Sequence, residues 1–278
     1  MAYDGYRSLR VAAEDGVAWV TIDHPPINLF DVALMQEMDR AGRELEADPD
    51  VRVVVFQSAN PEFFIAHADV ALIQTLPTTV PPKADRLGFF HAMVDRFRTM
   101  PKATIGQIAG RARGGGSEFL LSLDMRFAAI GKAVLSQPEV ALGIIPGGSG
   151  TQRLPRLVGR ARALEIVLGC EDFDAEVAER YGWVNRALPA DELAPFVERL
   201  ARRIASFPAE AIALAKESVA AAELPTVDGL LEEAHCFNRA LATAAAQERM
   251  ARFLALGGQT ADVELELGAL VARLRPSS

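Results

Sequence analysis

Cysteine and histidine are both scarce in this sequence, and their scarcity excludes several classes of protein. The 278 residues include two cysteines, Cys170 and Cys236, which lie in unlike sequence contexts. A disulfide-stapled secreted domain needs a regular cysteine pattern, so we expect two free thiols in a reducing compartment. The four histidines are scattered, and no Cys/His spacing matches a metal site. We therefore expect no metal centre.

Long apolar runs and positive charge are in short supply as well. No stretch reaches the roughly 18 apolar residues that a membrane span requires, and the N-terminus, MAYDGYRSLR, lacks the apolar core of a secretory signal. These absences predict a cytoplasmic protein with no membrane partner. Lysine and arginine number 29 against 37 acidic residues, which gives a formal net charge of −8. This acidic balance argues against nucleic acid as a partner.

The N-terminal part of the chain carries signals for both strands and helices. Hydrophobic residues make up 50% of the chain, which is ordinary for a folded domain. Residues 6–22 predict a hairpin that turns at Asp15-Gly16. Residues 31–47 predict a helix capped by Asp31, and residues 51–58 predict a strand buried on both faces.

Further along, strands and helices alternate until the pattern becomes almost wholly helical. We predict a short helix after residue 69, a loop over 77–84, a helix over 85–99, a strand over 104–109, two short helices over 160–168 and 174–181, and a short strand over 183–189. The later helices are predicted over 190–206, 208–222, 226–256 and 259–274. This order favours a mixed α/β fold, with a core over residues 1–200 and a helical region over 201–278.

The stretch from Thr104 to Pro155 concentrates the chemically informative residues. An apolar run, a turn and the three glycines Gly114 to Gly116 lead directly into a predicted helix. A glycine turn that opens a helix leaves backbone N–H groups without partners, and such groups favour a bound anion or a developing oxyanion. Glu118 follows one turn into this helix, and Glu139 follows in the segment QPE. The sequence therefore predicts one site built from two carboxylates and a glycine turn.

Five segments occur in an order that resembles a known enzyme family. They are HPPINLFD (24–31), FFIAHAD (63–69), IAGRARGGGSEF (108–119), SQPEVALGIIPGGSGTQRLPRLVG (136–159) and AERYGWVNRALP (178–189). Together they resemble the enoyl-CoA hydratase/isomerase (crotonase) superfamily over roughly residues 8 to 220. The glycine block followed by QPE and PGGSGTQRL is specific in combination, although each piece alone would be weak.

The resemblance implies an overall architecture and an assembly. It implies a crotonase-like spiral of repeated strand-strand-helix turns, which fits the mixed α/β pattern. It also implies that the helical C-terminal region over 201–278 drives formation of a homotrimer, which in this family often pairs into a hexamer.

The resemblance also implies a substrate and a set of site residues. The expected substrate and partner is an acyl-CoA thioester, and no separate cofactor is implied because coenzyme A arrives as part of the substrate. By motif position, the expected site comprises the catalytic acids Glu118 and Glu139, the oxyanion-hole donors Ala68 and Gly115, and the substrate-binding residues Ala66, His67 and Asp69.

The chemistry implied by these residues is hydration of a 2-enoyl-CoA. Water addition to a conjugated thioester builds negative charge on the thioester oxygen, which two fixed N–H donors stabilise. One carboxylate must take a proton from water, and one carboxylic acid must supply a proton to the α-carbon. We expect Glu118 to be the base and Glu139 the proton donor.

Several alternative functions stay open. A Δ3,Δ2-enoyl-CoA isomerase needs only one acid, so the presence of two favours hydration without deciding the case. The superfamily also contains decarboxylases, dehalogenases and C–C bond-cleaving enzymes. The chain could instead be a non-catalytic relative that binds acyl-CoA; RNA binding would call for a basic surface stripe, which the acidic balance opposes.

Individual residues also have simpler interpretations. Glu118 and Glu139 could be acids that complement the start of a helix. Arg111 and Arg113 flank the glycine turn, and they could form salt bridges or meet a polar acyl group. His67 stands where the family commonly has glycine, which would be costly if the backbone there had a positive φ. It could be an accommodated turn residue or contact the substrate, and Asp69 could cap the next helix.

Overall fold

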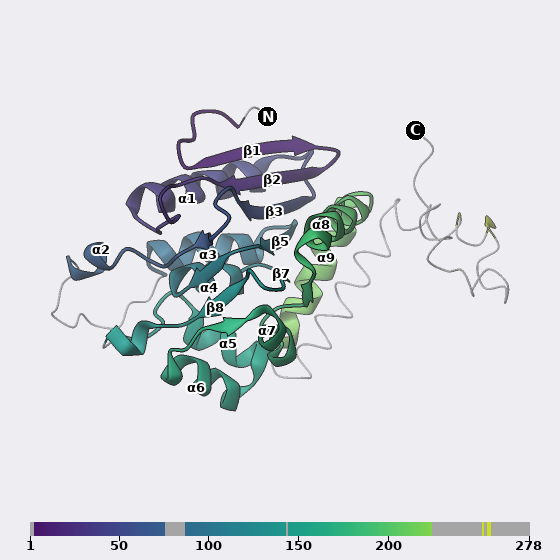
Figure 1. Cartoon of the computed structure of the whole chain (residues 1–278). Coiled ribbons are helices and arrows are strands. Elements are labelled where there is room, and N and C mark those ends of the chain that lie inside the picture. Colours follow the sequence, from purple (N-terminus) through teal and green to yellow (C-terminus); the bar gives the residue numbers. More distant parts are fainter. Residues whose placement is uncertain (1–2, 76–86, 143, 224–251, 253–254, 257–278) are drawn as a thin grey trace.

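The computed structural model describes residues 3–75, 87–142, 144–223, 252 and 255–256 (Figure 1). The predicted loop over 77–84 lies outside the described residues. So do the predicted helix 259–274 and all of the predicted helix 226–256 except residues 252, 255 and 256.

Two sheets organise the described chain (Figure 1). The larger sheet contains β1 (Leu9–Glu14), β2 (Val17–Ile22), β3 (Val53–Ser58), β5 (Ala103–Ile108), β7 (Met125–Ala129) and β10 (Arg186–Leu188), in that order. Its neighbours pair in parallel except for the β1–β2 hairpin. The smaller sheet contains β4 (Phe63–Ile65), β6 (Arg111–Arg113), β8 (Val134–Ser136) and β9 (Phe173–Asp174).

The chain alternates between these sheets and so builds a spiral. β3, β5 and β7 lie in the larger sheet, and each is followed by a strand of the smaller sheet: β4, β6 and β8. Helices then return the chain to the next turn. They are α2 (Val70–Gln74) and α3 (Phe89–Thr99) after β4, α4 (Gly115–Leu121) after β6, and the 3₁₀ helix η1 (Glu139–Leu142), α5 (Gly150–Val158) and α6 (Arg160–Gly169) after β8. This confirms the predicted spiral of strand-strand-helix turns.

The N-terminal predictions are confirmed in detail. The hairpin turns at Asp15-Gly16, and both residues adopt the positive φ that this turn requires. α1 spans Val32–Ala47, and the Asp31 side chain caps it by accepting a hydrogen bond from the Leu34 N–H. β3 is buried on both faces because its alternate residues enter two separate hydrophobic clusters.

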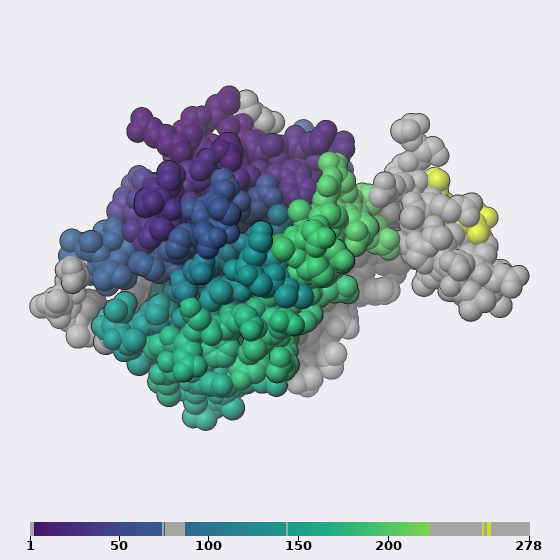
Figure 2. All heavy atoms as spheres, in the orientation of Figure 1, coloured from purple at the N-terminus to yellow at the C-terminus, as the bar shows by residue number. Residues whose placement is uncertain are grey.

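Two later helices, α8 (Ala190–Ala205) and α9 (Ala209–Ala220), cover the outer face of the larger sheet. Leu193, Val197, Ala201 and Ala205 recur at helical spacing on α8 and pack against the sheet. In the space-filling view the two helices, in green, lie along one side of the body (Figure 2). The predicted division at residue 200 falls within α8, and it stays a prediction.

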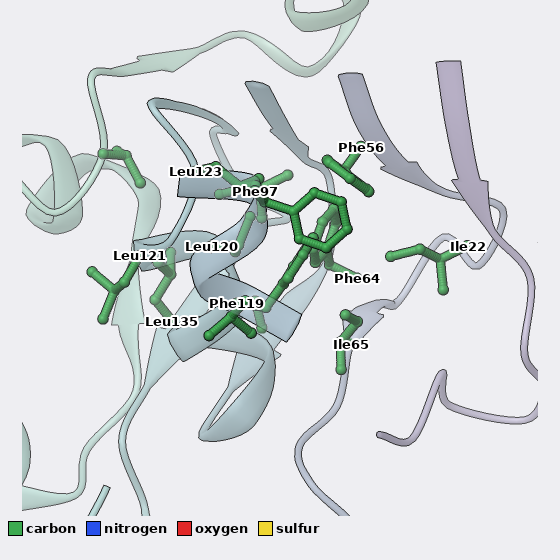
Figure 3. Close-up of a cluster of buried hydrophobic side chains, with 14 of the residues drawn as sticks. Ile22, Phe56, Phe64, Ile65, Phe97, Phe119, Leu120, Leu121, Leu123 and Leu135 are labelled. Carbon is green, nitrogen blue, oxygen red and sulfur yellow. The ribbon is translucent and has the colours of Figure 1, made fainter. Parts of the chain in front are cut away.

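A cluster of phenylalanines between the layers fixes α4. The ring of Phe119 meets those of Phe56 and Phe97 edge to face, with centroids 5.0 and 5.6 Å away (Figure 3). Such pairs add to the stabilisation that burial alone gives. At the other end of the helix, the buried Arg126 guanidinium donates hydrogen bonds to the carbonyls of Leu120 and Leu123. α4 is therefore held by its side chains and by hydrogen bonds to the Leu120 carbonyl in its last turn and to the Leu123 carbonyl just beyond it.

Other boundaries differ from the sequence prediction. The helix predicted over 85–99 begins at Phe89, after Gly88, and the strand predicted over 183–189 is limited to Arg186–Leu188. Trp183 and Val184 are buried in the turn before it, so their apolar character reflects core packing. α7 (Ala175–Tyr181) agrees with the prediction and is capped by Asp174, whereas α5 and β7 were not predicted.

Candidate active site

The candidate site lies where three parallel strands of the smaller sheet end. β4 pairs with β6, and β6 pairs with β8, both in parallel. Their carboxyl ends therefore meet at one edge of the sheet. Residues 66–69 follow β4, residues 114–118 follow β6 and residues 137–139 follow β8. The spiral thus brings together the segments that the sequence predicted to form one site.

The glycine turn is required by conformation and by close packing. Gly114 has a φ of 46°, and a Cβ on it would lie 2.7 Å from the Glu139 Oε1 atom. A Cβ on Gly116 would lie 2.3 Å from the Ile65 carbonyl oxygen, which is closer than real contacts allow. The glycines therefore let α4 begin directly against the ends of the neighbouring strands.

Ala68 and Gly115 lie next to each other. The Ala68 nitrogen is 3.4 Å from the position that a Cβ on Gly115 would take. The Ala68 N–H donates to no acceptor among the described residues. Gly115 is the first residue of α4, where N–H groups have no partner within the helix. Two backbone donors are consequently available in one place.

A short bridge to the N-terminal region holds the Ala68 segment. The Phe30 N–H donates to the His67 carbonyl at 2.9 Å, and the Asp69 N–H donates to the Phe30 carbonyl at 3.0 Å. The Ala66 N–H donates to the Ile27 carbonyl at 3.2 Å, and Ala66 is buried. The motif HPPINLFD therefore supports the segment that carries the first expected donor.

His67 and Asp69 have identifiable local roles. The His67 Nδ1 atom lies 2.8 Å from the Ala68 carbonyl oxygen. Because a carbonyl oxygen only accepts, Nδ1 must carry the proton there. His67 is not among the described residues with a positive φ, so the backbone cost considered from the sequence does not arise. Asp69 caps α2 by accepting a hydrogen bond from the Ala71 N–H, as one of its sequence interpretations stated.

Glu118 is almost fully buried and is held by the N-terminus of α5. The residue is 4% exposed, and its Oε1 atom accepts hydrogen bonds from the Gly148 N–H at 2.7 Å and the Gly150 N–H at 2.8 Å. Burial raises the pKa of Glu118, while the two N–H donors and the nearby Arg153 lower it, and the net direction is upward. The N–H groups and the helix dipole favour the ionised form against the effect of burial.

Glu139 lies at the start of η1 in a different environment. Burial raises its pKa to about 7, its own backbone N–H opposes that shift, and the charge of Glu118 adds to it. Its Oε2 atom is buried and has no hydrogen-bond partner among the described residues. Two neighbouring carboxyl groups in such surroundings can hold different protonation states near neutral pH.

Two arginines beside the glycine turn are engaged in ion pairs. Arg111 meets Glu62 with an Nη1–Oε2 distance of 2.7 Å. Arg113 binds Asp172 through two of its nitrogens, in the bidentate arrangement that suits a guanidinium and a carboxylate. Of the two interpretations of Arg111 and Arg113, the structure therefore agrees with the salt bridges.

Sequence reasoning missed the residues that hold Glu118. The donors Gly148 and Gly150 lie some thirty positions further along the chain, and the only available signal was the glycine-rich run PGGSG. It also missed Gln137, which is fully buried and donates from Nε2 to the Ser117 hydroxyl at 3.2 Å. The site thus depends on a second glycine turn as well as on the first.

Within the described part of the chain, no group of three or more His, Cys, Asp or Glu side chains could hold a metal ion. None of the described helices combines the length and the apolar character needed to cross a bilayer.

The arrangement combines the components of acid–base chemistry beside an anion site. A carboxylate stabilised by N–H donors can accept a proton, and a carboxyl group with a pKa of about 7 can supply one. The neighbouring N–H groups of Ala68 and Gly115 can stabilise negative charge on an oxygen. This set suits proton transfer next to a carbonyl group.

Comparison with known proteins gives a consistent family. The family model described as enoyl-CoA hydratase/isomerase matches residues 12–257. A probable enoyl-CoA hydratase of Mycobacterium tuberculosis is 34% identical over 251 residues, which cover 90% of this chain and 95% of that protein. The crotonyl-CoA hydratase of Syntrophomonas wolfei is 33% identical, with 90% and 95% covered.

A solved structure agrees with these sequence relatives. The crystal structure of a Streptomyces avermitilis protein, provisionally assigned as an enoyl-CoA hydratase, is 43% identical with a TM-score of 0.71. It covers 97% of this chain and 99% of that one. The chain is thus an enzyme of the hydratase type with a crotonase fold, and it belongs to the enoyl-CoA hydratase/isomerase family.

Proposed function

We propose that this enzyme adds water across the double bond of a 2-enoyl-CoA thioester. One observation carries the proposal: two carboxyl groups with opposed surroundings lie beside two available backbone N–H donors. The name of the crotonyl-CoA hydratase relative supports a short enoyl-CoA as the first substrate to test.

The thioester carbonyl binds with its oxygen between the N–H groups of Ala68 and Gly115. Water attacks C3, the electrons of the double bond move toward the carbonyl, and negative charge collects on that oxygen. Glu118 takes the proton that water loses, and Glu139 gives its proton to C2. The product is a 3-hydroxyacyl-CoA. Removing one oxyanion donor of this type typically costs on the order of 3 kcal/mol of barrier.

The surroundings of the two acids match this division of roles. Glu118 accepts two N–H bonds at the start of α5, which favours its carboxylate form as the base. Glu139 lacks those donors and has a pKa of about 7, which favours the protonated form as the acid. After each turnover the proton on Glu118 must leave and Glu139 must regain one, which restores the starting state.

The segment after β4 positions the rest of the substrate. Ala66, His67 and Asp69 flank the Ala68 donor, and we assign them to contacts with the thioester and the adjoining part of coenzyme A. Coenzyme A enters as part of the substrate, so the proposal needs no separate cofactor.

Turnover of crotonyl-CoA tests the proposal directly. The expected result is loss of the enoyl absorbance and formation of 3-hydroxybutyryl-CoA, and a screen of longer enoyl-CoAs then gives the chain-length preference. Absence of hydration at every chain length, combined with isomerisation of a 3-enoyl-CoA, would reverse the assignment in favour of an isomerase. Binding of the thioester without turnover, unaffected by Glu118→Gln, would indicate a non-catalytic acyl-CoA-binding protein.

A further inference from the structure

Ser149 has a backbone conformation that disfavours serine. Its φ is 112° and its ψ is −6°, in a region that favours glycine. It stands between Gly148 and Gly150, where a third glycine would be free of this cost. Strained residues of this kind persist where the surrounding structure determines them, and they cluster at functional sites.

The surroundings of the Ser149 hydroxyl are also unfavourable, because it is buried without a hydrogen-bond partner among the described residues. The residue is 7% exposed, and its Oγ atom has no hydrogen-bond partner among the described residues. It occupies the N-cap position of α5, yet its side chain makes no capping hydrogen bond. Serine is common at N-caps because its hydroxyl normally accepts such a bond. A buried hydroxyl without a partner calls for an explanation, and a bound molecule supplies one.

The position of Ser149 indicates where that molecule lies. The N–H groups of its two neighbours both donate to the Glu118 Oε1 atom, at 2.7 and 2.8 Å. The carbonyl carbon of Ser149 is bonded to the Gly150 nitrogen, so the residue comes within about 4 Å of the Glu118 carboxylate. Ser149 therefore lies beside the group that acts as the base.

We propose that the Ser149 hydroxyl hydrogen-bonds the oxygen atom that is added at C3 of the substrate, an inference that rests on the proposed hydratase function. The attacking water directs one hydrogen to Glu118, its base, and its oxygen has two lone pairs. One lone pair forms the bond to C3, and the other accepts the Ser149 O–H bond. In the reverse reaction the same hydroxyl donates to the departing oxygen. No covalent bond to serine forms, and Ser149 neither gains nor loses a proton.

Two substitutions separate this role from a structural one. Ser149→Ala removes the hydroxyl and keeps the strained backbone, and we expect kcat for hydration of crotonyl-CoA to fall about five- to twentyfold, as loss of one hydrogen bond implies. Ser149→Gly removes the hydroxyl and the strain together, so we expect a similar fall in kcat with a higher Tm. A residue with only a structural role would give the higher Tm with no change in kcat.

Cys170→Gly is the matched control. Cys170 also has a positive φ, 57°, but it ends α6 and is not part of the proposed site. Its replacement should raise Tm and leave kcat unchanged. Unchanged kcat in both Ser149 variants would overturn the proposal.

A change in substrate preference in place of a fall in kcat would also overturn the proposed role of Ser149. If Ser149→Ala spared crotonyl-CoA but changed the preference for an enoyl-CoA with a hydroxylated acyl chain, the hydroxyl would contact the chain and not the added oxygen. If the unaltered enzyme hydrated no enoyl-CoA, the proposed function would fail first and this inference with it.

Discussion

Glu118 and Glu139 have identical side chains but different hydrogen-bond partners. Glu118 accepts two backbone N–H bonds at the N-terminus of α5, and these oppose the effect of its burial. Among the described residues, the backbone N–H of Glu139 itself opposes the effect of burial on its pKa, and the charge of Glu118 adds to the upward shift. Backbone geometry therefore gives two identical side chains the different surroundings on which their proposed roles as base and acid rest.

Replacing either acid should abolish most of the turnover. We expect Glu118→Gln and Glu139→Gln each to lower kcat by about 10² to 10⁴, the range for loss of a general acid or base. Glutamine keeps the size of the side chain, so far-UV circular dichroism should stay unchanged. The exposed Glu171→Gln is the control and should retain full activity. Full activity in either active-site variant would remove that residue from the mechanism.

The rate of hydration should depend on pH in a bell shape. Glu139 must be protonated to act, so kcat/KM should decline as pH rises through its pKa of about 7. Glu118 must be ionised, so kcat/KM should decline as pH falls through its raised pKa. Initial rates between about pH 4 and pH 9 would give both limbs. A rate that keeps rising above neutral pH would contradict the assignment of Glu139 as the acid.

The raised pKa of Glu139 also predicts a pH-dependent stability. A carboxyl group whose folded pKa is about 7, against an ordinary 4.5, binds its proton more tightly in the folded state. The wild type therefore loses stability as pH rises through that interval. Glu139→Gln lacks this loss, so its Tm relative to wild type should be higher at about pH 8 than at about pH 4. Thermal scans at the two pH values measure it, and equal differences would show that Glu139 is not perturbed.

The site residues that lie within short motifs could be predicted from the sequence. The residues that contact the site from a distant part of the chain could not. The motif FFIAHAD and the glycine block marked Ala68 and Gly115, which the structure places side by side. The hydrogen bonds from the PGGSG turn to Glu118 cannot be inferred from local spacing, because they depend on where the chain returns after β8. Ser149 was missed for the same reason.

At the scale of elements, α4 carries the site and depends on the aromatic cluster. Phe119 follows Glu118 directly and is fully buried against Phe56, Phe64 and Phe97. The Phe119 side chain points into the core, and the Glu118 side chain points toward α5. The packing of Phe119 therefore fixes the helix on which Glu118 is placed.

Phe119→Ala should destabilise the protein strongly. Truncation of a fully buried phenylalanine typically costs about 3 to 5 kcal/mol, which urea unfolding would measure as a lower midpoint. Activity should fall as well, because Glu118 would lose its fixed position. Val219→Ala, at a site that is 75% exposed, should change stability by less than about 0.5 kcal/mol. A similar small effect for Phe119→Ala would show that the cluster does not anchor α4.

Three of the missed strands share a physical cause. β4, β6 and β8 have three residues each, which is too short for an alternating pattern to be recognised. β3 was predicted from a continuous apolar run with β-branched residues, and α1 from apolar residues at helical spacing after the cap Asp31. Short strands owe their existence to pairing with neighbours from other turns of the spiral, and a single segment does not contain that information.

At the scale of the whole molecule, we propose that the chain assembles as a homotrimer or as a dimer of trimers. With a chain mass of 30.0 kDa, light scattering after gel filtration should give about 90 or about 180 kDa. A chain that ends after residue 223 lacks most of the region, 201–278, that is expected to drive assembly, so it should elute at a smaller mass. A monomeric full-length protein would contradict the proposal.

The meeting of three strand ends has a consequence for how such enzymes can diversify. Neighbouring strands stand about 4.8 Å apart because backbone hydrogen bonds set that interval. Ala68, Gly115 and Glu139 follow three adjacent strands. The spacing between the strands therefore sets the distances between these three positions. Side chains at each strand end can then be exchanged without a change in the distances between the backbone positions. One spiral could in this way accommodate different reactions of the same thioester group.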